Sequence, residues 1–144
     1  MKNDSKRFRE QIRLLERKLG LLSKGNNGSF CCSKVTLSQC HTLVEIGRVK
    51  TLSLKDLADI LSLDTSTTSR TVDTLVKKSY AQRDNDPNDR RSIQIKLTDS
   101  GQKLYQDIEN KMNNDFSTCF EKIPTSEREN VLHSMDIILN ALQE

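Results

Sequence analysis

The chain has 144 residues, of which 30% are charged and 4% are aromatic, with five Gly, two Pro and no Trp. This length suits a single domain with a buried core, and so few helix breakers favour a helical protein over a β-sandwich or barrel. No apolar run approaches the roughly 20 residues that span a bilayer, and no apolar stretch follows the basic opening residues, so we expect a soluble protein of the cytoplasm without a secretory signal.

The net charge of +3 is unevenly distributed along the chain. Residues 1–35 carry nine Lys or Arg against three acidic residues, whereas residues 98–144 carry four against nine. The excess of positive charge in the first two thirds of the chain weakly indicates a nucleic-acid partner.

Apolar residues at helical spacing predict a first helix over residues 4–23. The sequence Gly-Asn-Asn-Gly-Ser at residues 25–29 is expected to end it. The narrow apolar stripe of this helix consists of Phe8, Ile12, Leu15, Leu19 and Leu22.

Two short helices with their own capping residues are expected next. Thr36 and Gln39 form a capping box that opens a helix over 37–46, and Gly47 is expected to close it. Ser53 has the pattern of another helix start. The buried face of this second helix is predicted to hold Leu54, Leu57, Ala58 and Leu61.

A third short helix is predicted over about 65–78, with a tight turn at Ser62 and Leu63 before it and Asp64 as its N-cap. Its inward-facing positions are Thr68, Val72, Leu75 and Val76. Hydroxyl side chains and one arginine occupy its other faces, namely Ser66, Thr67, Ser69, Arg70 and Thr71.

Two strands are predicted to follow, one from Tyr80 to Arg83 and one over residues 92–97, where apolar and polar residues alternate. The polar segment 84–91 between them is expected to be a hairpin loop, with Pro87 where no ladder donor is needed.

Two further helices complete the chain. Thr98 is expected to cap a helix over about 99–120, and Thr125 or Ser126 to cap the last helix over 126–142. Their apolar edges consist of Leu104, Ile108, Met112, Phe116 and Phe120, and of Val131, Met135, Ile138 and Leu142.

Two short helices joined by a tight turn, followed by a β-hairpin with a basic tip, give the order of a winged helix-turn-helix, a mainly α fold with a small β-hairpin wing. The hydroxyl residues and Arg70 at the N-terminal end of the helix over 65–78 suit base edges and phosphates in the major groove of duplex DNA. Arg90 and Arg91 at the hairpin tip suit the adjacent minor groove, where the negative potential is strong.

The sequence over 52–101 resembles the MarR family of winged helix-turn-helix transcriptional regulators. Its most specific element is Asp-Pro-Asn-Asp-Arg-Arg in the wing, followed by a strand that ends in Leu-Thr. The resemblance implies that Asp89 and Arg91 pair across the hairpin and that an arginine, with Arg90 beside it, enters the minor groove. The family usually has Gly where this chain has Ser79, so we expect a slightly altered exit from the preceding helix.

The resemblance also implies one domain over residues 1–144, in which residues 36–98 bind DNA and residues 1–35 and 99–144 form dimerisation helices. Apolar stripes left open on the first and last helices would be exposed patches, which agrees with a homodimer; packing within one subunit is the alternative. A two-fold dimer implies a pseudo-palindromic operator. Repression is the commoner mode in such families, and a small effector generally releases the DNA.

Three cysteines surround the start of the helix over 37–46. Cys40 lies one turn inside that helix, so Cys31 or Cys32 can come back to it. Three thiolates suit a soft metal or metalloid such as Cu(I), Zn(II) or trivalent arsenic, and His41 is a further candidate ligand about a quarter turn away. Thiol oxidation is an alternative, as is Cys40 as a small core residue. No cofactor is obligatory.

An enzyme and a metal-storage protein are the competing classes. A thiol-dependent enzyme needs an activated Cys beside a general base, but the sequence has no CxxC, no glycine-rich phosphate loop, no HExxH and no paired carboxylates at a credible site. A metal-storage protein would not need the basic wing. We therefore expect a DNA-binding regulator, not an enzyme, and expect Cys119 on the long helix to be a core residue.

Overall fold

The computed structural model describes residues 2–22 and 34–143, which form two compact units, one up to Asn110 and the other from Lys111. Among the described residues, no helix combines the length and apolar character needed to cross a membrane. The buried apolar side chains of the described chain all belong to the first unit. They are Val35, Cys40, Leu43, Ile46, Leu52, Leu57, Ala58, Val72, Leu75, Ala81, Ile95, Leu104 and Ile108.

The first helix, α1 (Lys2–Lys18), ends earlier than predicted. Gly20 adopts a positive φ of 72°, and the N–H of Leu21 donates to the carbonyl of Glu16 (3.1 Å). This is the hydrogen bond of a glycine-terminated helix, and it satisfies one of the last carbonyls. The predicted later end was therefore wrong, and the segment 25–29 that was expected to supply it lies outside the described residues.

Helix α2 (Leu37–Val49) begins with the predicted capping box. The Thr36 hydroxyl accepts from the N–H of Gln39 (3.3 Å), and the side-chain oxygen of Gln39 accepts from the N–H of Thr36 (3.2 Å). The predicted end at Gly47 is wrong, because the helix continues to Val49. A Cβ on Gly47 would lie 2.6 Å from Cγ of Tyr105, so this glycine admits the tyrosine ring and does not end the helix.

A three-stranded antiparallel sheet lies beside the short helices. β1 (Thr51–Ser53) pairs with β3 (Asp89–Leu97), and β3 pairs with β2 (Ala81–Asp86), so the order is β1-β3-β2. The register places Leu52 opposite Ile95, and both side chains are buried. β1 was not predicted, because three residues show too little alternation to mark a strand.

Helices α3 (Leu54–Leu61) and α4 (Thr65–Lys77) begin at the predicted caps. The Ser53 hydroxyl caps α3, and the Asp64 carboxylate caps α4. Val76, predicted to face inward, is 37% exposed because it lies at the edge of the buried face of α4. The other inward predictions are buried at Leu57, Ala58, Thr68, Val72 and Leu75 and partly buried at Leu54 and Leu61.

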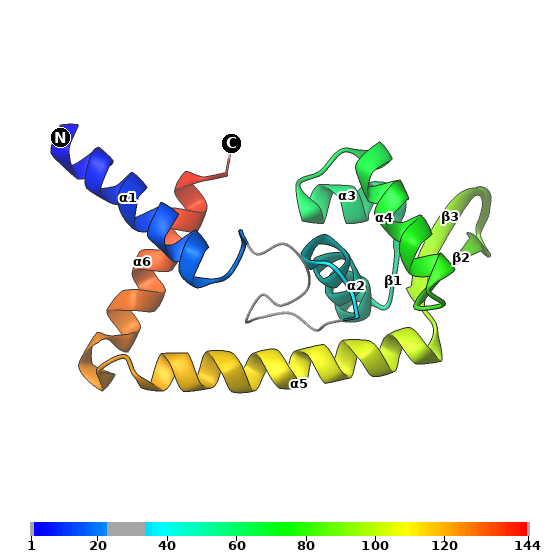
Figure 1. Cartoon of the computed structure of the whole chain (residues 1–144). Helices are drawn as coiled ribbons and strands as arrows, with labels where there is room; N and C mark the ends of the chain where they lie inside the picture. The colour runs from blue at the N-terminus through cyan, green and yellow to red at the C-terminus, as the bar shows by residue number, and fades with distance from the viewer. Residues whose placement is uncertain (1, 23–33, 144) are drawn as a thin grey trace. The chain divides into compact units, whose positions relative to one another are not determined.

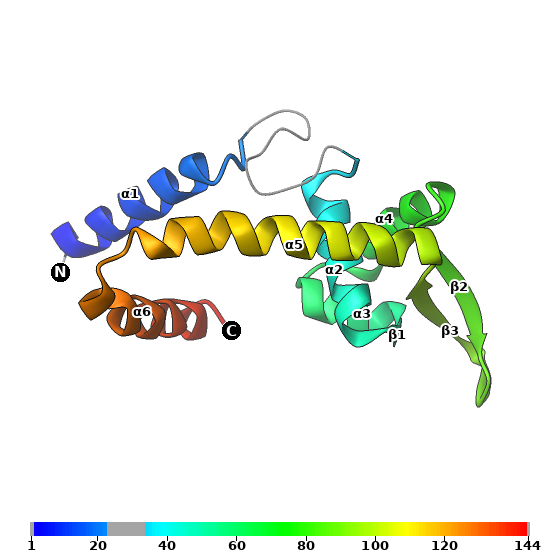
Figure 2. The same ribbon diagram turned by 90° about the horizontal axis from the view of Figure 1, so that it is seen from below.

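The segment 84–91, predicted to be a loop, is mostly strand. Only residues 87–88 form the turn between β2 and β3. Polar pairs such as Lys96 with Asp84 (2.6 Å) link the two strands, and polar side chains on both faces remove the alternation that marks a strand in sequence. α4 lies beside the hairpin, whose tip projects away from α2, α3 and α4 (Figures 1 and 2).

Helix α5 (Asp99–Glu121) starts at the predicted cap, since the Thr98 hydroxyl accepts from the N–H of Gly101 (3.0 Å). A Cβ on Gly101 would overlap the carbonyl oxygen of Tyr80 and lie 2.8 Å from its carbonyl carbon. The start of α5 therefore packs directly against the backbone that leads from α4 into β2. The buried residues of α5 are Gly101, Leu104 and Ile108.

The second unit contains the end of α5, a short 3-10 helix η1 (Thr125–Glu127) and α6 (Arg128–Ala141). Neither η1 nor α6 has a side-chain cap, so the predicted caps Thr125 and Ser126 are wrong. Large apolar side chains of this unit are exposed, namely Phe116, Val131, Leu132, Met135, Ile137, Leu139 and Leu142.

Arg128 replaces a capping side chain at this junction. Its guanidinium donates to the carbonyls of Glu121 and Ile123 (both 3.2 Å) and lies 5.4 Å from the centroid of the Phe120 ring. Carbonyls at a helix C-terminus have no intrahelical partner. One side chain from α6 therefore satisfies the end of α5 and fixes the turn between the two helices.

Candidate nucleic-acid interface

Asp64 fixes the N-terminal end of α4. Its Oδ1 accepts from the N–H of Thr67 (2.7 Å), and its Oδ2 accepts from the Thr67 hydroxyl (2.7 Å). These hydrogen bonds hold the pKa of Asp64 below its ordinary value of 3.8, and the one from the Thr67 backbone contributes most. The cap is therefore charged at neutral pH, and the Thr67 hydroxyl is engaged on its own helix.

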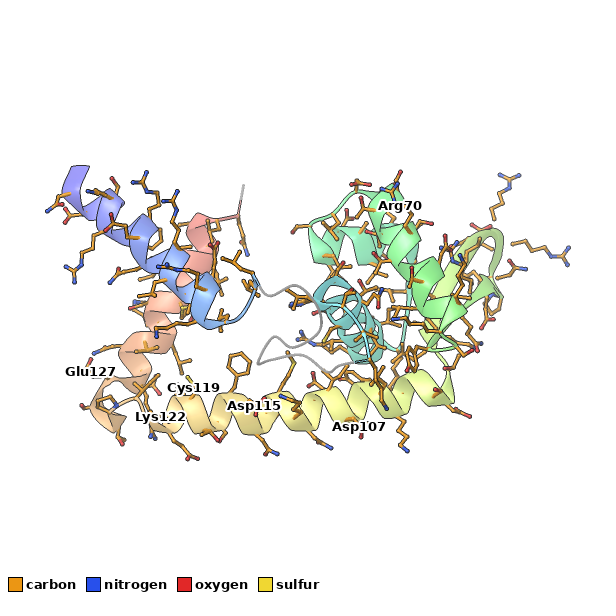
Figure 3. All side chains as sticks on the ribbon, in the orientation of Figure 1. Arg70, Asp107, Asp115, Cys119, Lys122 and Glu127 are labelled. Carbon is orange, nitrogen blue, oxygen red and sulfur yellow. The ribbon has the colours of Figure 1, made fainter. Side chains whose placement is uncertain are left out.

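The predicted contact residues of α4 are not equally accessible. Ser66 and Arg70 are exposed, and Figure 3 shows Arg70 at the outer end of α4, away from α2. The hydroxyl of Thr71 donates to the carbonyl of Thr67 (3.2 Å), and both side chains are partly buried. Ser66 and Arg70 are thus the α4 side chains best placed to meet a partner.

The tip of the hairpin presents two arginines. Arg90 and Arg91 are both exposed, and neither forms an ion pair within the described part of the chain. Oδ1 of Asp89 accepts from the backbone N–H of Arg91 (2.9 Å). Both residues belong to β3, so this bond lies within one strand and not across the hairpin as the resemblance implies, and it leaves the Arg91 guanidinium unused.

Arg83, in β2, was missed by the sequence analysis. Its Nη2 lies 2.8 Å from Oδ1 of Asp73 and donates to the hydroxyl of Ser69 (3.1 Å). Ser69 was expected to face DNA, and its hydroxyl accepts a hydrogen bond from Arg83 of the wing. The one sequence signal is Asp73, the single acidic residue within α4.

Polar side-chain contacts accompany the backbone pairing of the hairpin. Asp84 pairs with Lys96 (2.6 Å) and accepts from the Gln82 side chain (3.0 Å). These bonds hold the pKa of Asp84 below 3.8, and the hydrogen bond from Lys96 contributes most. Nearer the tip, the Gln94 side chain donates to Asp86 (3.2 Å). These side-chain contacts accompany the backbone ladder between β2 and β3.

The predicted three-cysteine site is only partly described. Cys31 and Cys32 lie outside the described residues, whereas Cys40 is buried in α2 and the neighbouring His41 is exposed. In residues 2–22 and 34–143, no three His, Cys, Asp or Glu side chains gather as a metal site would require. Cys119, expected to be a core residue, is exposed near the C-terminal end of α5 (Figure 3).

Lys78 connects the end of α4 with the start of α2. Its Nζ donates to the carbonyl of Lys34 (3.2 Å) and to the side-chain oxygen of Gln39 (3.0 Å). Gln39 belongs to the capping box of α2, and Lys34 follows closely after Cys31 and Cys32 in sequence. One side chain therefore links the backbone at Lys34 to the residue that follows α4.

A shallow cavity of about 420 Å³ lies between α2 and the C-terminal end of α3. Its lining includes the apolar side chains of Leu37, Ile60 and Leu63 and the polar side chains of His41 and Glu45. The lining is more apolar than polar, and the cavity is open to solvent.

Helices α2, α3 and α4, together with a projecting hairpin on a three-stranded sheet, define a winged helix-turn-helix protein (Figure 1). The family model described as the MarR family matches residues 35–93, from just before α2 into β3. Over these residues the chain is similar to the MarR family.

Known proteins of similar sequence and structure agree with this assignment. The chain is similar to the HTH-type transcriptional regulator BilQ of Clostridioides difficile, with 29% identity over 114 residues that cover 77% of each chain. It resembles Streptococcus pneumoniae FabT, solved in complex with DNA, with a TM-score of 0.71 and 16% identity over 98% of this chain and 96% of that one. Bordetella bronchiseptica BpsR, whose DNA binding is regulated by 6-hydroxynicotinic acid, gives a TM-score of 0.72 and 19% identity over 92% and 98%.

Proposed function

We propose that the chain is a transcriptional repressor of the cytoplasm that binds duplex DNA as a homodimer. The observation that carries the proposal is the pair of exposed basic elements on one winged helix-turn-helix, Arg70 on α4 and Arg90 with Arg91 at the wing tip. BilQ supports a regulatory role, and FabT supports DNA as the partner of this fold. The similarity to the MarR family favours a regulator over an enzyme.

In this proposal α4 is the recognition helix and lies in the major groove. Ser66 is small enough to let the helix backbone approach the bases, and Arg70 has the length to reach a guanine or a phosphate. The N-terminal end of α4 favours a phosphate through its partial positive charge. Arg90 and Arg91 enter the adjacent minor groove, where a narrow groove concentrates negative potential.

A second copy of the chain is proposed to cover the exposed apolar side chains of α1 and α6. Phe8 and Leu15 on α1 are 45% and 44% exposed, and α6 carries no buried residue. Apolar groups left in this state favour association. Residues 1–35 and 99–144 are the proposed dimerisation segments, and the two-fold axis calls for a pseudo-palindromic operator with half-sites about 34 Å apart.

Effector control is proposed to act through the start of α2. Thiolates of Cys31, Cys32 and Cys40 would bind a soft metal or metalloid, or be oxidised. The bond from Lys78 to the carbonyl of Lys34 supports this route, since it joins the segment after the cysteines to the end of the recognition helix. The cavity beside His41 offers the alternative of an organic effector.

The test is binding of the full-length protein to duplex DNA from its own upstream region, measured by fluorescence anisotropy at several salt concentrations. Each neutralised phosphate adds about 0.9 to the log–log slope of affinity against salt. We expect specific binding with a steep slope and saturation at one dimer per operator. Absent binding, or binding that salt does not affect, would contradict the proposal.

A further inference from the structure

We propose that Arg83 is a positioning residue that sets the angle between the recognition helix α4 and the wing. The inference rests on the proposed DNA binding and deepens it, because it concerns how two separate DNA-contacting elements are kept in register with each other. Neither Arg83 nor its partner Asp73 needs to touch DNA for this role.

The contacts of Arg83 span the gap between the two elements. Nη2 lies 2.8 Å from Oδ1 of Asp73 and donates to Ser69 at both its hydroxyl (3.1 Å) and its carbonyl oxygen (3.3 Å). Ser69 and Asp73 are four residues apart on α4 and therefore lie on one face of it. One guanidinium thus binds a full turn of the recognition helix.

The position of Arg83 in the sheet lets its contact with α4 control the angle of the hairpin. Arg83 lies opposite Ile95 on β3, and Ile95 also pairs with Leu52 on β1. Just beyond this level β1 ends, and the hairpin continues as two strands alone. Arg83 therefore binds α4 at the base of the free ribbon, where a small change in angle moves the arginines at the tip furthest.

The same contact orients the Ser69 hydroxyl. Because its oxygen accepts from Arg83, its own proton is directed elsewhere and can be donated to a phosphate or to an acceptor on a base. The contact with Arg83 therefore leaves the Ser69 hydroxyl able to donate to DNA.

The pair contributes more to geometry than to stability. The side chains of Asp73 and Arg83 are 55% and 31% exposed, and ion pairs at this exposure change the free energy of unfolding little. Asp73 also puts a negative charge on the recognition helix. Simple electrostatics therefore predicts tighter DNA binding when Asp73 is neutralised, whereas a positioning role predicts weaker binding.

This opposition defines the experiment, which uses the full-length protein and the variants Asp73→Asn and Arg83→Lys. We expect Asp73→Asn to weaken operator binding about fivefold although a negative charge is lost. Arg83→Lys keeps the charge but replaces the rigid planar guanidinium with a more flexible ammonium group, so it should weaken binding similarly. The matched control is Asp59→Asn on α3, an exposed acid without an ion pair in the described chain, which should bind equally or more tightly.

Residual dipolar couplings of backbone N–H groups measure the orientation of β3 relative to α4. A loss of stability alone would not change this orientation. The couplings should report a changed or broadened orientation of β3 relative to α4 in Asp73→Asn, with an unchanged urea midpoint. The double variant Asp73→Arg with Arg83→Asp should restore both orientation and affinity. Tighter binding by Asp73→Asn, or unchanged orientation in both single variants, would overturn the inference. If the unaltered protein fails to bind DNA, the proposed function fails, and the couplings alone still test the role of Arg83 in orientation.

Discussion

Gly101 packs against the peptide of Tyr80 so closely that a Cβ on Gly101 would overlap the Tyr80 carbonyl oxygen. The contact joins the start of α5 to the backbone between α4 and β2, and the carbonyl concerned also accepts from the N–H of Thr98 (3.1 Å). The contact lies between the start of a helix and a stretch of backbone. No flexible side chain can therefore move aside to admit a Cβ on Gly101.

Gly101→Ala is therefore expected to lower the free energy of unfolding by about 3 kcal/mol, at the upper end for overpacked sites. Urea unfolding at neutral pH measures the loss. The matched control is Gln102→Ala, the next residue, which is exposed and should be nearly neutral. Equal stability of the two variants would contradict the close packing.

Ser79→Gly is expected to stabilise the protein by about 0.5 kcal/mol. Ser79 has a φ of 63°, in the left-handed region that costs side-chain-bearing residues energy, although the loss of chain entropy in glycine offsets part of the gain. Ser79→Ala keeps the Cβ and should give no gain by the same unfolding measurement. A stabilised alanine variant would show that the serine hydroxyl, and not the backbone angle, is the cause.

Arg91→Ala is expected to weaken operator binding about tenfold while the dimer stays intact. The guanidinium is exposed at the tip and only the Arg91 backbone is bound by Asp89, so its loss should not disturb the hairpin. Anisotropy titration and sedimentation measure the two properties. Lys103→Ala, an exposed cation of α5, serves as the control and should bind normally. Unchanged affinity in Arg91→Ala would remove the wing tip from the interface.

Asp64 should make stability depend on pH in the acid range. Hydrogen bonds from Thr67 hold its folded-state pKa below 3.8. The stabilisation by the charged cap is therefore complete above the unfolded value near 3.8 and is lost as the pH falls through the lower folded value. Asp64→Ser keeps a capping oxygen that does not titrate. The difference in stability between the two proteins should shrink on acidification, and a constant difference would exclude the carboxylate as its source.

The cysteines are expected to control DNA release but not DNA binding itself. The variant Cys31→Ser with Cys32→Ser should bind the operator normally and lose its response to whichever of arsenite, Cu(I), Zn(II) or peroxide releases the unaltered protein. Cys40 is buried, so alanine is the substitution to use there. Cys119→Ser is the control, and a phenolic acid tests the organic alternative. If every active compound still releases the cysteine variants from the operator, the thiols take no part in the response.

The sequence predicted best what is determined locally. The caps at Thr36, Ser53, Asp64 and Thr98 depend on residues three apart, and all four form as predicted. Gly47 was misjudged because its role is set by Tyr105, more than fifty residues away in the chain.

Features that depend on pairing were not predictable in this way. The strand character of residues 84–91 comes from backbone pairing between β2 and β3, and β1 exists only because β3 lies beside it. Arg83 was missed because its partner Asp73 comes within reach only after the helix, the turn and the strand have all formed.

The free part of the hairpin also has a definite length. β1 pairs with β3 only at residues 94–96, so the five residues 89–93 extend beyond the sheet as a two-stranded ribbon. At 3.4 Å per residue this reach is about 17 Å, which is half of the roughly 34 Å repeat of the double helix. With α4 in the major groove, as proposed, this span matches the step to the adjacent groove, and a hairpin longer by one residue pair is expected to misplace the tip arginines.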